Sequence, residues 1–172
     1  MSKLLILAIF LLLSGVACNG EINRQERENM EKTVLKMAKA IQTNNIEEYL
    51  KTLNMEALKS SCKEVSQAKT EEQHIYEECV SEKERNIRGK FTIATEKKLI
   101  PGSAGFEITG MNLERNYIST RVKISYAAKN DAFRTDEGRI CKEAVVKIHY
   151  NKSEKFFLPL ETASVTVLSE YK

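Results

Sequence analysis

The chain of 172 residues carries 27 basic and 24 acidic side chains, which leaves a formal net charge of only +3 at pH 7. It has no basic stripe that alternates with aromatic residues, so the electrostatic signature of a nucleic-acid-binding protein is missing. Hydrophobic residues make up 42% of the chain and charged residues 30%, which excludes a disordered protein and fits a single globular domain.

Residues 1–17 have the order of a signal peptide, with a basic start, an apolar middle and small residues at the end. Lys3 supplies the positive charge, residues 4–13 form an unbroken apolar run, and small residues then lead to Cys18. The apolar stretch that ends at Ala17 is shorter than the ~20 apolar residues that cross a bilayer core. The sequence therefore predicts an export signal rather than a membrane-spanning anchor.

The stretch that ends at Cys18 reads Leu-Leu-Leu-Ser-Gly-Val-Ala-Cys and resembles a bacterial lipoprotein signal. The resemblance implies that Cys18 becomes the lipid-bearing first residue and that the lipid attaches the protein to a membrane of the cell envelope. Two acyl chains hold such a protein stably, because each buried methylene adds ~0.8 kcal/mol. Gly15 departs from the family, which usually has Leu three residues before the cysteine. Secretory cleavage after Ala17 is the alternative, and it would give a freely secreted protein.

We expect residues 18–28 to form a polar tether and residues 29–172 to form one domain. That domain contains Cys62, Cys79 and Cys141. In an oxidising compartment three cysteines predict one disulfide and one thiol left over, provided that the lipid occupies the first cysteine. We predict a disulfide between Cys62 and Cys79, with Cys141 reduced. Pairing of Cys141 with either of the others is the competing hypothesis.

The first half of the domain has the apolar periodicity of helices. Residues 30–41 form one predicted helix and residues 46–53 a short second one, with Glu47 and Glu48 in its first turn, where the helix dipole favours acids. The apolar positions of the two helices are Met30, Val34, Met37, Ala38, Ile41, Ile46, Tyr49, Leu50 and Leu53.

A further helix is predicted over residues 70–86. It opens with Thr70-Glu71-Glu72-Gln73, which has the spacing of a capping box. The segment before it is predicted to be less regular, with a short turn over residues 54–58 and an irregular polar stretch over residues 63–69.

From Phe91 onward the apolar period changes from helical to two, which is typical of strands. In the clearest segment, Ile118, Val122 and Ile124 face one way while polar residues such as Ser119 face the other. Helices followed by such strands predict an α+β fold, in which N-terminal helices pack on a curved, mainly antiparallel sheet. The predicted strands are residues 91–94, 106–109, 117–126, 143–150, 155–158 and 163–168.

This order resembles the nuclear transport factor 2-like superfamily. The resemblance rests on the helix, break and short helix that contain Ile-Gln-Thr-Asn-Asn-Ile-Glu-Glu-Tyr-Leu, and on closing strands ending in Phe156-Phe157. It implies a cone-shaped domain whose helices cover the sheet, a shape that many exported bacterial lipoproteins share. The helix over residues 70–86 and the strand after Pro159 depart from the family. A cystatin-like sheet would give a similar pattern.

The residues that carry chemistry form no recognisable motif. No two cysteines have the two-residue spacing of a zinc or redox site, and His74 and His149 are the only histidines that could join them. His149, on the same strand face as Lys147, could serve as a general base, but the sequence identifies no Ser or Cys partner for it. The predicted inward positions Val122, Ile124, Val146 and Ile148 are apolar, which favours binding over catalysis.

We therefore expect no enzyme, no cofactor and no metal site. The expected partners are a membrane, reached through the lipid on Cys18, and an unidentified protein or small ligand, with no nucleic acid. The alternatives are a secreted, disulfide-stapled effector and, less favoured, a small hydrolase or isomerase of the same fold.

Overall fold

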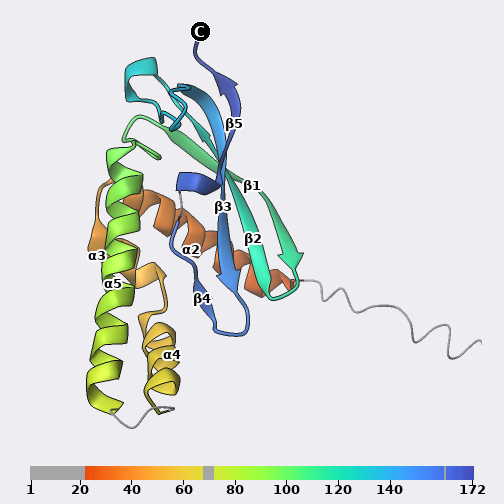
Figure 1. The fold of residues 1–172 in the computed structure, drawn as a ribbon. Coiled ribbons are helices and arrows are strands. Elements are labelled where there is room, and N and C mark those ends of the chain that lie inside the picture. The colour runs from red at the N-terminus through yellow and green to blue at the C-terminus, as the bar shows by residue number, and fades with distance from the viewer. Residues whose placement is uncertain (1–21, 68–71, 161) are drawn as a thin grey trace, which may run out of the picture.

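The computed structural model describes residues 22–67, 72–160 and 162–172 (Figure 1). The predicted signal peptide, Cys18 and the first residues of the predicted tether lie outside the described residues. So do Thr70 and Glu71 of the predicted capping box.

The described part of the chain places its helices before its strands, which confirms the predicted α+β fold class. The helices are α2 (Arg24–Gln42), α3 (Ile46–Thr52), α4 (Met55–Gln67) and α5 (Glu72–Glu96). The strands are β1 (Gly105–Glu114), β2 (Tyr117–Ser125), β3 (Cys141–Asn151), β4 (Phe156–Phe157) and β5 (Val165–Glu170). Two short 3-10 helices, η1 (Lys129–Asp131) and η2 (Thr162–Ser164), lie between strands.

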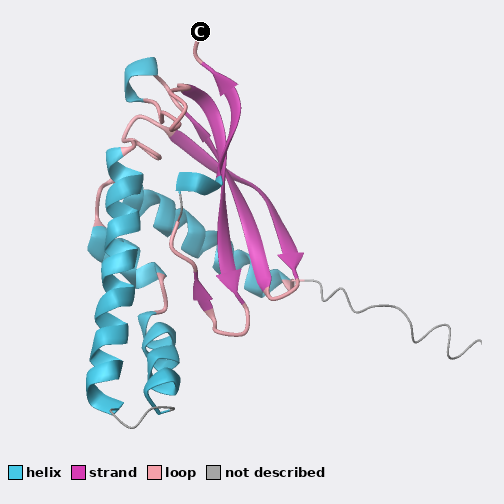
Figure 2. Cartoon of the chain, viewed as in Figure 1, coloured by secondary structure: helices cyan, strands magenta, loops and turns pink. Residues whose placement is uncertain are grey.

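The strands form one antiparallel sheet with a pronounced twist (Figure 2). β1, β2 and β3 are neighbours in that order, and the other edge of β3 is shared by two strands. β4 pairs with the end of β3 at Tyr150 and Asn151, whereas β5 pairs with its first half. β1 pairs only with β2 in the described part of the sheet, and the register between them shifts between Ile108 and Gly110.

One face of the sheet is covered by helices. Figure 1 shows α2 crossing behind the sheet and α5 running beside it, with α4 packed along the first half of α5. α2 buries an apolar stripe that includes Val34, Met37 and Ile41, and these residues share one hydrophobic cluster with the strands. The predicted inward residues are buried, as the sequence indicated: Ile118, Val122, Ile124, Ala144, Val146 and Ile148.

The predicted tether is partly helical, which corrects its boundary. α2 begins at Arg24, so residues 24–28 belong to the folded domain rather than to a linker. The side chain of Asn23 accepts a hydrogen bond from the backbone N–H of Glu26 at 2.8 Å, which satisfies a free donor of the first turn. Arg24 and Glu28 add an ion pair at 2.9 Å with helical spacing. Polar residues therefore start the helix without any apolar signal.

The predicted strand over residues 91–94 is wrong, because these residues lie in α5. Phe91 and Ala94 fall on a helical stripe with Ile87, and all three are buried, while Ile93 is 45% exposed. A run of four residues fits both the helical and the strand period. Here the helical period continues, and the helix predicted to end near residue 86 extends to Glu96.

The segment before α5 is also more regular than predicted. α4 contains both the residues expected to form a short turn and residues 63–67, which were expected to be irregular. The side chain of Asn54 accepts from the N–H of Ala57 at 3.3 Å and starts the helix. Leu58 and Cys62, one turn apart, are buried and give it an apolar side.

Tyr49 joins three parts of the chain that are distant in sequence. Its side chain is fully buried, and its ring centroid lies 5.1 Å from that of Phe91 of α5. Its hydroxyl accepts a hydrogen bond from the backbone N–H of Leu160 at 2.9 Å. Burial raises the pKa of Tyr49 to about 12. The residue therefore ties α3 both to α5 and to the segment that follows β4.

The first prediction tests the register of the sheet. Ile124→Asp should lower the free energy of unfolding by about 3 kcal/mol or more, because the new carboxylate loses its hydration on the covered face. Leu168→Asp makes the same chemical change on β5, where Leu168 is 52% exposed, and should cost less than about 1 kcal/mol. Urea unfolding of both variants measures the difference, and equal losses would show that the assigned register is wrong.

The second prediction concerns Tyr49. Tyr49→Phe should cost about 1–3 kcal/mol, because the buried N–H of Leu160 loses its acceptor. Tyr117→Phe, at a partly exposed ring, is the matched control and should change stability by less than about 0.5 kcal/mol.

The same substitution should alter the alkaline limb of stability. The folded protein keeps the phenol of Tyr49 neutral up to about pH 12, whereas an unfolded tyrosine ionises near pH 10. The stability that this shift contributes is therefore present below pH ~10 and lost as pH rises towards 12. Tyr49→Phe should lose less stability than the wild type over that interval, and parallel curves would contradict the assignment.

Candidate functional site

The predicted disulfide between Cys62 and Cys79 is present, and it joins α4 to α5. The two sulfur atoms are 2.09 Å apart, the two Cα atoms are 5.8 Å apart, and the residues are separated by 17 positions. Cys141 is unpaired and buried in β3, where burial raises the pKa of its thiol. A thiol held in its protonated form is a poor nucleophile, so Cys141 has a packing role.

The disulfide lies in the helical hairpin that extends beyond the sheet (Figure 1). Among the described side chains of this hairpin, the large buried ones are Leu58 of α4 and Ile87 and Phe91 of α5. Lys83 supports the hairpin by donating to the hydroxyl of Ser61 at 2.6 Å. A covalent link is therefore a large part of what holds α4 against α5.

The third prediction is the contribution of this link. Replacing both Cys62 and Cys79 by Ser should lower the free energy of unfolding by ~3 kcal/mol, the chain-entropy value for a loop of this size. Cys141→Ala, which removes the thiol that forms no disulfide, should cost less. Non-reducing peptide mapping should find the 62–79 cross-link. A cross-linked peptide that contains Cys141 would contradict the pairing.

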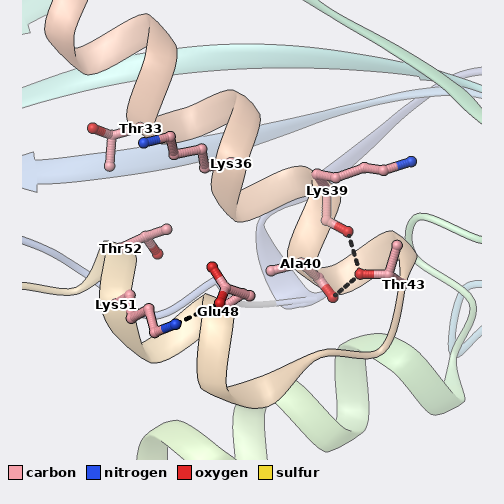
Figure 3. A pocket seen from close by; sticks show the side chains of 8 residues that line it. All are labelled: Thr33, Lys36, Lys39, Ala40, Thr43, Glu48, Lys51 and Thr52. Carbon is pink, nitrogen blue, oxygen red and sulfur yellow. Dashed lines mark hydrogen bonds and ion pairs between the residues drawn. The ribbon is translucent and has the colours of Figure 1, made fainter.

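A shallow cationic groove of about 380 Å³ lies between α2 and α3, and we call it the α2–α3 groove (Figure 3). Thr33 and Lys36 enter it from α2, and Thr52 faces them from α3. Its full lining is Thr33, Lys36, Lys39, Ala40, Thr43, Glu48, Lys51 and Thr52.

Two of the groove's three lysines already have partners. Lys51 forms an ion pair with Glu48 at 2.5 Å, and Lys39 donates to the side-chain oxygen of Gln42 at 2.9 Å. All three lysines are exposed to solvent. The α2–α3 groove is therefore positive but largely hydrated.

A smaller pocket of about 190 Å³ opens where three elements meet, and we call it the His149 pocket. β3 contributes Lys147 and His149, and α5 contributes Lys90. The remaining wall is formed by Leu158, Pro159 and Ser164, from the segment that links β4 to β5. This wall is held in place because the backbone N–H of Leu158 donates to the carbonyl of His149 at 2.8 Å.

The imidazole of His149 has two neighbours on β2. The hydroxyl of Ser119 lies 3.1 Å from its Nδ1 atom, and the ring of Tyr117 meets it edge-on with the centroids 6.3 Å apart. Ser119 is only 1% exposed, although the sequence predicted a solvated outward position for it. The register pairs Ser119 directly with His149, so the imidazole lies against the hydroxyl.

The sequence identified no serine partner for His149, and the structure supplies one. The distance between the two side chains is within the reach of a nucleophile and its base, but the hydroxyl of Ser119 is only 1% exposed and is therefore shielded from an external substrate. The contact holds the imidazole at its Nδ1 atom. With Nδ1 engaged, Nε2 is the ring nitrogen left to interact with a ligand in the pocket.

In residues 22–67, 72–160 and 162–172, which the structure describes, no three His, Cys, Asp or Glu side chains come close enough together to hold a metal ion. None of the helices described there has the length and apolar character that crossing a membrane requires.

A scan against protein-family models, a search of curated proteins and a search of solved structures each found no match. The resemblances drawn from the sequence therefore rest on its own residues.

Proposed function

We propose that this protein is exported, is attached to a membrane of the cell envelope by a lipid on Cys18, and acts as a binding module. The observation that carries the proposal is the Cys62–Cys79 disulfide, because disulfides form and persist outside the reducing cytoplasm. It agrees with the leader-like residues 1–17 and with the small residues that precede Cys18.

The distribution of polar groups supports binding over catalysis. The polar side chains buried in the described part of the chain are those of Thr52, Ser119, Thr120 and Asn151, none of which titrates near neutral pH. Active sites usually gather titratable groups with shifted pKa values inside a cavity, whereas here the covered face of the sheet is apolar. The polar hollows lie at the surface instead, in the α2–α3 groove and the His149 pocket.

The nuclear transport factor 2-like resemblance is part of this proposal, and what supports it is the arrangement of the layers. Helices α2 and α3 precede a curved antiparallel sheet that α2 covers, as that superfamily would require. The α4–α5 hairpin and β5 are the elements that would be additions to it.

A small hydrolase is the second candidate, and the contact between Ser119 and His149 is the observation that favours it. The burial of Ser119 counts against this candidate. A hydrolytic activity towards simple esters that disappears in Ser119→Ala would establish it in place of a binding role.

The fourth prediction tests the anchor. Cys18→Ser should leave export intact but release the protein from membranes, because only a thiol accepts the lipid. The wild-type protein should stay in the membrane pellet after a carbonate wash, and its intact mass should exceed that of residues 18–172 by two or three acyl chains.

Cys141→Ala provides the matched control, since it also removes a cysteine and should stay in the membrane pellet. If Cys18→Ser also stays in the pellet, attachment does not depend on a lipid at Cys18 and the lipoprotein proposal fails. If the wild-type mass shows no lipid and the protein is released from membranes, it is secreted rather than anchored.

A further inference from the structure

We propose that the His149 pocket binds an oxyanion, namely the carboxylate or phosphate group of a small ligand. The inference deepens the proposed function by assigning a site and a ligand class to the binding module. It is independent of how the protein is attached to a membrane.

The first support is an unfavourable arrangement of charge. In the register of β2 and β3, Arg121 lies directly opposite Lys147, and like charges in that position destabilise a sheet. Neither side chain forms an ion pair in the described part of the chain. Glu143, an acid on the same face, is already paired with Lys123 at 2.6 Å. A bound anion would offset this repulsion.

The position of Arg121 shows how the free protein tolerates the repulsion. Its guanidinium leans away from Lys147 and over Gly110 of β1, where a Cβ atom would lie 2.7 Å from its Nη2 atom. The glycine therefore makes room for the guanidinium. Lys147 lines the pocket together with Lys90 of α5, and the charge of Arg121 adds to the positive potential on the same face of the sheet.

The second support is an oriented imidazole. His149 lines the pocket while the buried hydroxyl of Ser119 holds its Nδ1 atom and Tyr117 packs against its ring. Because Ser119 already holds the ring, His149 loses little conformational entropy when its Nε2 atom binds a ligand. The free-energy cost of binding is therefore lower. Lys147 and His149 therefore offer two groups that can meet one oxyanion from the same strand.

The size and walls of the pocket define what it can hold. About 190 Å³ is below the 300–1,000 Å³ or so that sites for drug-sized molecules occupy, so one oxyanion and a short adjoining group fill it. Leu158 and Pro159 give it an apolar wall suited to that adjoining group. The wall is anchored on both sides, by the bond from Leu158 to His149 and by the bond from Leu160 to Tyr49.

The α2–α3 groove is the weaker candidate for an anion. Two of its three lysines already interact with Glu48 and Gln42, and all three are exposed to solvent. In the His149 pocket, a lysine that forms no ion pair with the described residues stands beside an imidazole held by a buried hydroxyl, and the lining of the α2–α3 groove contains no such imidazole.

The fifth prediction uses the two histidines of the chain as reporters. Sodium phosphate and sodium acetate are titrated separately into the isotope-labelled protein, as isolated, at constant ionic strength. Side-chain NMR signals of both imidazoles are followed. The signal of His149 should shift and saturate with at least one anion, while that of His74, which is exposed on α5, should not. The anion that saturates tells whether phosphate or carboxylate is recognised.

Lys147→Gln should weaken this binding about tenfold or more, the effect of losing one charged hydrogen bond. Lys142→Gln is the matched control, an exposed lysine of the same strand that lies outside the pocket, and it should bind like the wild type. The proposal is overturned if neither anion saturates, if both histidines shift in parallel, or if Lys147→Gln binds as tightly as the wild type. Membrane attachment through Cys18 is measured in a separate experiment. A failure of anion binding would therefore not contradict the anchor, and loss of the anchor would not contradict anion binding.

Discussion

The architecture depends on the hydrogen bond that Tyr49 accepts from Leu160 while its ring packs on Phe91. In the segment that follows β4, the N–H of Leu158 bonds to β3 and the N–H of Leu160 bonds to Tyr49, so this second bond secures the segment to the helical layer. β5 can then return to the same edge of β3 that β4 has left. The same bond braces Leu158 and Pro159 as the wall of the His149 pocket. One buried phenol therefore links the core to the candidate site.

The two faces of the sheet differ in character, one being mainly apolar and the other polar. The face that α2 covers is lined mainly by aliphatic residues, and Thr120 is the polar side chain that β2 adds to them in the described sheet. The opposite face carries Arg121, Lys147 and His149. The buried Ser119 contacts His149. Burying a hydroxyl on a mostly open face costs free energy unless it is hydrogen-bonded, and His149 meets that need. The polar face is thus organised as well as solvated.

The sequence predicted those features in which one period dominates a long segment. Val122 and Ile124 were assigned to the core because alternation persists along β2, and Tyr49 because it repeats at helical spacing with Leu53. The strand predicted over residues 91–94 is wrong, because a run of four residues fits both the helical and the strand period. The helical period becomes clear only when Ile87 is counted on the same apolar stripe. The contact between Ser119 and His149 could not be foreseen. The contact depends on the register between β2 and β3. That register cannot be read from the sequence of the segment with η1 that connects the two strands.

The irregularity in β1 bears on how copies of the protein behave when they are crowded. In the described part of the sheet the outer edge of β1 pairs with no strand, and such edges invite neighbouring chains to add to them. The register shift leaves Thr109 without a partner between Ile108 and Gly110, which twists the strand and interrupts the row of free backbone groups. Glu107 and Glu114, both exposed, add like charges that would oppose a second copy. The irregular register thus makes the open edge of β1 a poorer template for a second copy of the chain.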